Sequence, residues 1–386
     1  MKGKLYIISA FFVIHAIFSI LGIAAAQRAS ILLIEIMAFS SLVVNAGRLF
    51  NDRTVLIVLI YVTYLLFGAF TADEHLHNLI YTLTEVLWWP SVFILFTSLF
   101  KYNADYYRWI RSFVYLIFFV NTALFLLEIS TRLSSSEALR TNTVFFVLML
   151  APLATLIRNT RNRFALLFLV LTCSVMSGKR SAMIAIALLL LIEWVRYMRT
   201  SSRNKFRTVI ISVFSAVLLA GAVFAVESAL GISFVERFQG LEEDGGSGRT
   251  EAFVQVSFRY SQLPFEDKLL GCGHNAVRVE DFVSLDFSKD EALSAHNDFL
   301  EVLYDYGLIG LILYLLFVFR IIALTRYWRK VDKEYYYSML GSLAVFFVMS
   351  MVSHLVIYPT YFAYLMIFWA YMFNEKRKRI LELRYK

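Results

Sequence analysis

Charged residues are scarce in this chain, and so are prolines and cysteines. Only 17% of its 386 residues are Asp, Glu, Lys or Arg, while 59% are hydrophobic. A soluble protein of this length would carry strands, turns and amphipathic helices with a charged face, for which this composition leaves too few charges. The composition therefore excludes an ordinary soluble enzyme.

The chain also lacks the motifs of several catalytic classes. Its two cysteines, Cys173 and Cys272, lie in different environments, so we expect no disulfide, and no Cys/His cluster has the spacing of a metal site. The nucleotide-binding signature G-x-x-x-x-G-K-[ST] is absent, because the glycines of "EEDGGSGRT" precede no Lys-Ser or Lys-Thr. We therefore expect neither ATP hydrolysis nor a bound metal or cofactor.

The chain does contain a series of apolar stretches of roughly 15–22 residues, separated by short basic clusters. This pattern is typical of a polytopic helical membrane protein, and its continuous runs exclude an outer-membrane β-barrel. The predicted fold is an all-α transmembrane bundle of about twelve spans. The apolar segments fall at about 5–26, 29–46, 54–71, 79–100, 112–130, 141–157, 164–177, 181–198, 208–226, 307–324, 337–357 and 361–373.

The first apolar segment has a second interpretation as a signal peptide, because Ala24, Ala25 and Ala26 resemble a cleavage site. However, the run of about 20 residues is longer than a usual signal core, and His15 interrupts it. We therefore expect the segment to be retained as the first span.

The basic residues predict the orientation of the spans. With the N-terminus in the cytoplasm, the inner loops and the C-terminal tail hold 26 of the 37 lysines and arginines. The positive-inside rule therefore predicts that both termini are cytoplasmic. The net charge of +8 reflects this bias, so we expect no nucleic-acid partner. The segments 164–177 and 361–373 are short for a bilayer, which leaves eleven spans or a re-entrant segment as alternatives.

Four regions follow from this topology. Residues 1–226 carry the first nine spans, 227–306 form a long outer loop, 307–373 carry the last three spans, and 374–386 form a basic tail. The loop contains helical patterning and several aromatic residues, so we expect it to fold rather than to remain irregular.

Two basic sites on the outer side call for an explanation. Lys179 and Arg180 in "SGKRS" lie where basic residues are disfavoured, and Arg180 has the planar fork that binds phosphate well. An equally good interpretation is a side chain that snorkels to the membrane surface. Arg249 follows the glycines of "GGSGRTEAF" at the predicted start of an amphipathic helix, where backbone N–H groups favour an anion. By itself, Arg249 is more simply explained as a solvated loop residue.

His296 lies at the outer end of the tenth span. With Ser294 as a plausible N-cap, His296 falls in the first turn of a helix, whose positive end disfavours a protonated imidazole and lowers its pKa. A neutral histidine is what a general base requires, and Asn297, Asp298 or Glu301 are placed to order or orient the ring. A lone histidine in this position is more often an ordinary interfacial residue.

The three sites share one side of the membrane, and two cationic groups with one neutral base suit a lipid-linked phosphate donor and a hydroxyl acceptor. Other ionisable residues within spans are costly in lipid and are candidates as well, unless they form hydrogen bonds between helices. They are Glu35, Glu85, Glu128, Glu193, His15 and His354.

Four stretches in this order resemble the O-antigen polymerase and ligase superfamily: "SGKRSAMI", "GSGRTEAF", "LLGCGHN" and "AHNDFLEVLYDYGLIGLILY". These proteins are bacterial inner-membrane glycosyltransferases that use undecaprenyl-diphosphate-linked glycans. The resemblance covers about residues 165–325, and its most specific part is the stretch that begins at His296. The N-terminal half matches only in hydropathy, and His274 in "GCGHN" departs from the glycine-rich pattern, so its role is open.

The resemblance implies a metal-independent and nucleotide-independent transfer on the periplasmic side. Arg180 and Arg249 would hold the donor diphosphate, with Lys179 as a second contact, and His296 would deprotonate a sugar hydroxyl of the acceptor glycolipid. Attack at the anomeric carbon then expels undecaprenyl diphosphate with inversion. Membrane lipids, a flippase and chain-length regulator proteins are the partners that such an enzyme would meet.

Polymerase and ligase differ in the acceptor. A polymerase adds the glycan to a lipid-linked repeat unit, whereas a ligase adds it to the lipid A core, and the motifs do not separate the two. The abundance of Phe, Tyr and Ile favours the polymerase. A polysaccharide or lipid-linked oligosaccharide transporter is the alternative of another class, but it should show an internal repeat, and we find none.

Overall fold

The computed structural model describes residues 2–71, 79–99, 104–134, 141–200, 249–279, 295–353, 355–356 and 359–384. Within these residues every regular element is a helix, so the predicted all-α fold is confirmed. Several features discussed above lie outside the described residues: the expected span at 208–226, the loop segments 227–248 and 280–294, and His354.

The helices follow the predicted apolar segments closely. The first half of the chain forms α1 (Lys2–Ile20), α2 (Ala24–Val44), α3 (Ala46–Leu49), α4 (Arg53–Thr71), α5 (Leu79–Ser98), α6 (Ala104–Ser134), α7 (Val144–Ala154), α8 (Thr160–Met176) and α9 (Arg180–Thr200). The second half adds α12 (Arg249–Gln262), α13 (Phe265–Leu270), α14 (Ala276–Val279), α15 (Asp298–Val331), α16 (Lys333–Val352) and α17 (Pro359–Arg384).

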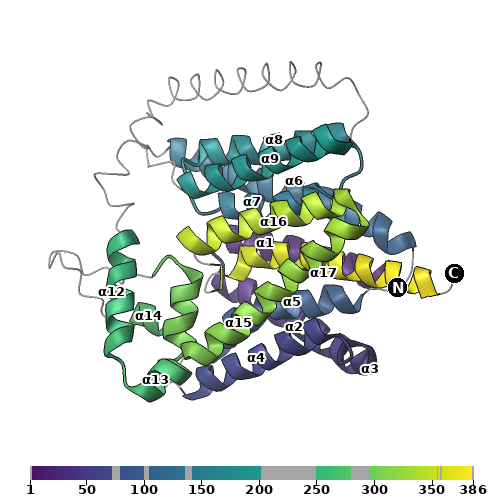
Figure 1. The fold of residues 1–386 in the computed structure, drawn as a ribbon. Coiled ribbons are helices and arrows are strands. Elements are labelled where there is room, and N and C mark those ends of the chain that lie inside the picture. The colour runs from purple at the N-terminus through teal and green to yellow at the C-terminus, as the bar shows by residue number, and fades with distance from the viewer. Residues whose placement is uncertain are drawn as a thin grey trace.

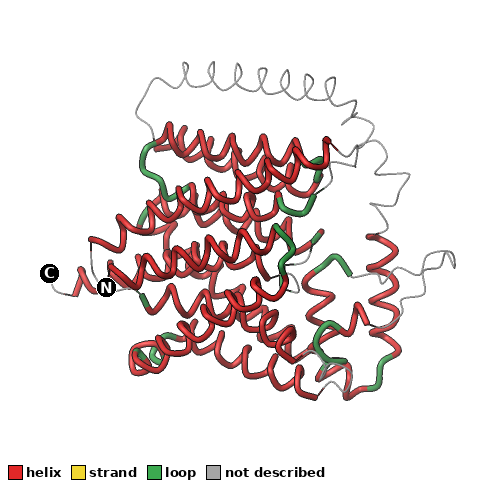
Figure 2. The backbone as a smooth tube through the Cα atoms, turned by 180° about the vertical axis from the view of Figure 1, so that it is seen from behind, coloured by secondary structure: helices red, strands yellow, loops and turns green. Residues whose placement is uncertain are grey.

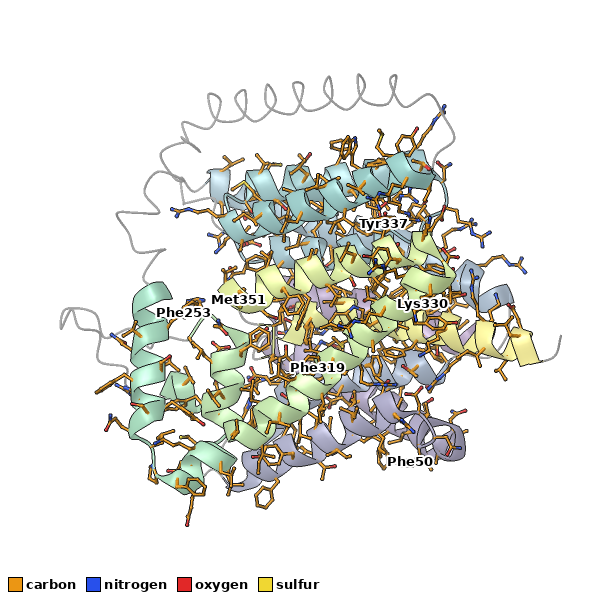
Figure 3. The ribbon with its side chains drawn as sticks, viewed as in Figure 1. Phe50, Phe253, Phe319, Lys330, Tyr337 and Met351 are labelled. Atoms are coloured by element: carbon orange, nitrogen blue, oxygen red, sulfur yellow. The ribbon has the colours of Figure 1, made fainter. Side chains whose placement is uncertain are left out.

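Length and composition explain why these segments form membrane helices. Among the described residues, five helical segments are long and apolar enough to cross a bilayer: α2, Arg108–Leu133 of α6, α9, α15 and α16. A helix satisfies its backbone hydrogen bonds internally, as lipid requires. Large apolar side chains point outward, such as Phe119 (74% exposed) and Phe319 (60% exposed; Figure 3), and would be unfavourable in water. The chain is therefore a multi-pass membrane protein.

The long helices run side by side in one bundle (Figures 1 and 2). The N- and C-termini lie at one end of this bundle, and α12, α13 and α14 lie at the opposite end (Figure 1). α17 is the central helix, since it packs against α5 and α7 and its residues 361–373 are all buried. An apolar helix without a charged face is expected in such a position.

Two helices differ in length from the predicted spans. The segment 361–373 is only the buried half of α17, which continues to Arg384 because the basic tail is rich in good helix formers. The segment 141–157 is α-helical only in its middle, and i→i+3 hydrogen bonds extend it toward Asn142 and Ile157. These tighter turns rise about 2 Å per residue and so lengthen the segment.

α15 changes direction at Gly307, whose φ of 64° and ψ of −170° are not helical. The predicted boundary between the outer loop and the tenth span falls at the same place. The residues before Gly307 pack with α13 and α14, and the residues after it run along α4 and α16. One helix therefore connects the outer segment to the bundle.

Candidate active site

Lys179 and Arg180 lie in the tight turn between α8 and α9. α8 ends at Met176, and Gly178 adopts a left-handed φ of 61° that reverses the chain. The Gly178 N–H donates to the Val175 carbonyl at 3.0 Å, which closes the end of α8. Arg180 is the first residue of α9, and both basic side chains are half-buried.

The packing of α9 against α16 sets the depth of Arg180 in the bundle. Arg196 near the end of α9 donates a hydrogen bond to Glu334 at the start of α16. In the middle of the two helices, Leu189 fills the space beside Gly341. Each step forward along α9 therefore corresponds to an equal step backward along α16, as expected for two antiparallel helices. The same register brings Arg180 level with the last turn of α16.

His296 lies directly before α15, and the prediction that it falls in the first helical turn is wrong. The N-cap is Asn297, whose Oδ1 accepts hydrogen bonds from the N–H groups of Phe299 (3.0 Å) and Leu300 (3.2 Å). The helix thus begins three residues later than a Ser294 cap predicts. His296 has a left-handed φ of 50°, which is rare for a residue with a side chain and recurs at functional sites.

Asp298 fixes the start of α15 against the connection between α16 and α17. Its Oδ1 accepts hydrogen bonds from the backbone N–H groups of Leu355 (2.7 Å) and Val356 (3.1 Å), and the side chain is fully buried. A buried carboxylate that accepts two N–H groups is held firmly. Asp298 therefore fixes the backbone two residues after His296, and a role in orienting the imidazole stays a prediction.

Glu301 and Asp305 continue the same face of α15, at helical spacings of three and seven residues from Asp298, and both are buried. Asp305 accepts hydrogen bonds from the N–H groups of Asn275 (2.9 Å) and Val277 (3.1 Å), at the start of α14. One face of α15 thus holds two separate segments in place. Asp305 was not among the predicted site residues, although its spacing from Asp298 could have indicated it.

His274 forms a buried polar contact that the sequence left unexplained. Its Nε2 lies 3.2 Å from Oε2 of Glu85 on α5, and its Nδ1 is hydrogen-bonded to the Tyr306 hydroxyl on α15. Because a carboxylate only accepts, both hydrogen bonds are satisfied when Nε2 carries the proton and Nδ1 accepts from the phenol. The contact joins the loop after α13 to two helices of the bundle.

Two glycines allow the end of α13 to touch the backbone of α15. Gly271 and Gly307 have φ values of 90° and 64°, and a Cβ atom on either one would overlap a backbone carbonyl of the facing segment. The Tyr64 hydroxyl of α4 lies 2.9 Å from the carbonyl oxygens of Leu270 and Tyr306. Its single O–H proton is within reach of both acceptors, which the end of α13 and the bend in α15 leave without a helical partner.

Arg249 is the first residue of α12, as the sequence predicts, and its side chain lies outside the described residues. α12 packs against α14 and the start of α15 through a small second core. The buried members of this core are Val256, Ala276, Val277, Ala295 and Tyr304. Ala295 directly precedes His296, and Val256 follows Arg249 by two turns, so this packing joins the two elements that carry the predicted diphosphate ligand and the predicted base.

The α8–α9 turn, α12 and the segment before α15 lie at one end of the bundle, opposite the termini. In the described part of the chain, no group of three or more His, Cys, Asp or Glu side chains is arranged to hold a metal ion. The predicted site residues whose side chains are described at this end include Lys179, Arg180 and His296. Such a set suits the binding of a phosphate and the transfer of a proton.

A comparison with protein families finds a match in this part of the chain. Residues 164–315 match the family model described as O-antigen ligase. The match covers most of α8, then α9, α12 to α14 and the first half of α15, and it includes Lys179, Arg180, Arg249 and His296. No curated protein matches the chain.

Proposed function

We propose that the protein is a membrane glycosyltransferase that extends a surface polysaccharide, because residues 164–315 match the family model described as O-antigen ligase. The donor is a glycan carried on undecaprenyl diphosphate. The acceptor is a sugar hydroxyl of a lipid-linked repeat unit, which makes the enzyme a polymerase of O-antigen or of a related glycan.

The observation that carries this proposal is that the α8–α9 turn, α12 and the segment before α15 lie at the same end of the bundle, with α12 packed against the segment before α15. In the proposed site, Arg180 and Arg249 bind the donor diphosphate, and Lys179 adds a further positive charge. Guanidinium groups suit this task because their planar fork offers two parallel N–H donors to phosphate oxygens.

The proposed reaction needs one base and one stabilised leaving group. His296 takes the proton from the acceptor hydroxyl while its oxygen forms a bond to the anomeric carbon of the donor. The bond from that carbon to the diphosphate breaks on the opposite face, so the configuration inverts and undecaprenyl diphosphate leaves with the electron pair. The two arginines stabilise the negative charge that develops on the diphosphate oxygen. Because diphosphate is already a good leaving group, no nucleotide is consumed.

The buried contacts around the site support this mechanism by making the frame rigid. Asp298 holds the start of α15, and Asp305 holds the start of α14. His274 and Tyr64 tie the neighbouring loop to α4, α5 and α15. Such a frame keeps the base and the diphosphate ligands at fixed separations. Holding the reacting groups in this way lowers the activation barrier.

The proposal includes an orientation in the bacterial inner membrane. The end that carries α12 to α14 faces the periplasm, where lipid-linked glycans are polymerised, and both termini face the cytoplasm. The basic residues near the termini support this orientation through the positive-inside rule. A flippase that delivers the donor and a chain-length regulator are the protein partners that this place in the membrane implies.

A ligase is the second candidate, because the matching family model is described as O-antigen ligase. In that case the same base and the same diphosphate site serve a different acceptor, the lipid A core. The two activities therefore differ in the acceptor molecule, whereas the residues named above serve both.

The glycan ladder of cells separates the two functions. Cells that lack the gene would receive the wild type, Arg249→Ala or Arg259→Ala at matched membrane levels. Arg259 is the matched control, since it lies on the same helix outside the proposed site. A polymerase restores long chains to cells that otherwise carry a single repeat on the core, whereas a ligase restores chains to a bare core.

Arg249→Ala is expected to abolish the long chains, because it removes a diphosphate ligand, while Arg259→Ala restores them. If Arg249→Ala and Arg259→Ala restore the ladder equally, the proposed diphosphate site is wrong. If the wild type changes neither the ladder nor the core, the protein is not a glycan polymerase or ligase.

A further inference from the structure

A cavity lies far from the candidate active site. This cavity of about 1460 Å³ opens at the end of the bundle that carries the termini. Its walls come from the start of α6, the turn between α7 and α8, the turn between α15 and α16, and the last turns of α17. The proposed glycosyl transfer makes no use of it.

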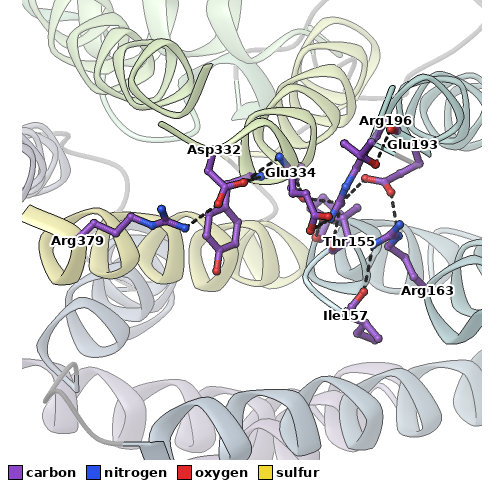
Figure 4. Close-up of polar contacts among 12 residues, drawn as sticks. Thr155, Ile157, Arg163, Glu193, Arg196, Asp332, Glu334 and Arg379 are labelled. Atoms are coloured by element: carbon purple, nitrogen blue, oxygen red, sulfur yellow. Dashed lines mark hydrogen bonds and ion pairs between the residues drawn. The ribbon is translucent and has the colours of Figure 1, made fainter. Parts of the chain in front are cut away.

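One wall of the cavity is a network of paired charges (Figure 4). Arg379 forms an ion pair with Asp332 at 2.6 Å. Arg196 pairs with Glu193 at 2.9 Å and with Glu334 at 3.2 Å, and Arg163 pairs with Glu193 at 3.0 Å. The two acidic groups that line this wall are therefore already neutralised by protein partners.

The remaining charges give the cavity a positive excess. Two further acidic residues line it, Glu375 and Glu382, against four further basic residues. Those basic residues are Arg108, Arg111, Arg158 and Lys378. Arg111 and Arg158 are exposed, and within the described part of the chain neither forms an ion pair. They are thus available to an anionic ligand that enters from the cavity mouth.

Apolar side chains also line the cavity, and Leu156 is the most exposed of them. They are Ile110, Val114, Leu153, Leu156 and Ile157, from α6, the end of α7 and the turn that follows it. A soluble anion has no hydrocarbon portion to bury against these side chains. A molecule that carries a phosphate beside a hydrocarbon portion matches both parts of the lining.

From this lining we infer that the cavity binds one anionic diacyl phospholipid. The phosphodiester lies between Arg111 and Arg158, where guanidinium groups donate to its oxygens. The glycerol and the first methylene groups lie against the apolar wall. Basic pockets between membrane helices on the side that carries the basic loops bind acidic head groups in this way. The inference does not depend on the proposed transferase activity.

The test uses the purified full-length protein in detergent, titrated with phosphatidylglycerol or phosphatidylcholine and followed by native mass spectrometry. The variant is the double substitution Arg111→Gln with Arg158→Gln. Arg326→Gln with Arg329→Gln is the matched control, because these arginines are exposed near the end of α15 and do not line the cavity. Thermal unfolding of all three proteins shows that each one is folded.

The wild type should bind one phosphatidylglycerol at least tenfold more tightly than phosphatidylcholine. The affinity should fall about fivefold for each arginine removed, and about 25-fold for the double variant, whereas the control changes less than about twofold. Equal binding of both lipids, or an unchanged affinity in the double variant, overturns the inference.

A second arm separates a lipid site from a general phosphate site. Inorganic phosphate and soluble glycerophosphoglycerol are added as competitors at millimolar concentration. A lipid site retains its phosphatidylglycerol, because neither competitor contacts the apolar wall. If either competitor displaces the lipid completely, the site recognises phosphate alone and the lipid assignment is wrong.

Discussion

His274 and Glu85 are 189 residues apart in the sequence, yet Nε2 of His274 lies 3.2 Å from Oε2 of Glu85. Tyr306 completes the contact at the other ring nitrogen. The three residues belong to the loop after α13, to α5 and to α15, so they join the outer segment to the bundle. The position of the candidate site relative to the membrane helices therefore depends on this buried polar contact.

The first prediction concerns Glu85. Glu85→Ala removes the acceptor of His274 and should destabilise the protein by about 1–3 kcal/mol, because a buried donor loses its partner. Glu85→Gln keeps an acceptor oxygen and should unfold close to the wild-type temperature in detergent. It should also retain the glycan ladder that Glu85→Ala loses. If both variants behave alike, the contact is not a positioning element.

The second prediction concerns Asp298. Asp298→Ala leaves the N–H groups of Leu355 and Val356 buried without an acceptor, and we expect a loss of about 2–4 kcal/mol. Asp298→Asn retains one carbonyl oxygen and should lose about half as much. Thermal unfolding measures the difference. Equal stability of Asp298→Ala and the wild type would show that these hydrogen bonds do not fix the start of α15.

The third prediction is a series of glycine substitutions. Gly47→Ala should be neutral or stabilising by up to about 1 kcal/mol, since Gly47 is helical and has no heavy atom near its Cβ position. Gly22→Ala tests the left-handed backbone alone, with an expected cost of about 1–2 kcal/mol. Gly307→Ala adds overlap with a backbone carbonyl and should cost the most. A different order of unfolding temperatures would contradict the close approach of α13 and α15.

The fourth prediction concerns the pH dependence of stability. Asp52 lies before α4, outside the span, and pairs with Arg377 of α17 at 2.5 Å. Burial alone would raise the pKa of Asp52, but Arg377 and the N–H groups of Thr54 and Val55 outweigh it and hold the pKa below its usual range. Because its pKa is lower in the folded state, ionised Asp52 stabilises the fold at pH values above about 4, which is its pKa in the unfolded state. This stabilisation is lost as the pH falls through the pKa of the folded state.

Asp52→Asn keeps a capping oxygen but removes the charge, so it isolates this contribution. The wild type should exceed the variant by about 1 kcal/mol at pH 7, and this difference should shrink as the pH falls below about 4. Unfolding midpoints at pH 7, 5 and 3 measure the difference. A constant difference across this range would mean that the charge of Asp52 adds nothing to stability.

Apolar length predicted most helices of the fold, because lipid requires continuous runs of apolar residues with internal hydrogen bonds. Apolar length did not predict the residues at which helices begin and end. α17 continues past residue 373 since polar helix formers extend a helix without any apolar signal. The start of α15 was misplaced because Ser294 and Asn297 are both good N-caps, and only the hydrogen bonds of Asn297 decide between them.

The candidate site was predictable only in part. Arg180, Arg249 and His296 stand out in the sequence because basic and polar residues are unusual beside apolar runs. Asp298, Glu85 and His274 were noticed for the same reason, whereas Asp305 and Tyr64 were not. His274 was noticed, but its partner Glu85 lies in a distant span, and spatial pairing of this kind leaves no mark on either segment alone.

The measurement that tests the central claim most directly is glycosyl transfer by the purified protein. Wild type, His296→Ala and Arg259→Ala would be mixed with undecaprenyl-diphosphate-linked repeat units, and both released undecaprenyl diphosphate and glycan length would be followed over time. Wild type and Arg259→Ala should release one carrier for each bond formed, while His296→Ala should be at least about 100-fold slower because the general base is missing. Transfer at the wild-type rate by a folded His296→Ala protein would contradict the proposed mechanism.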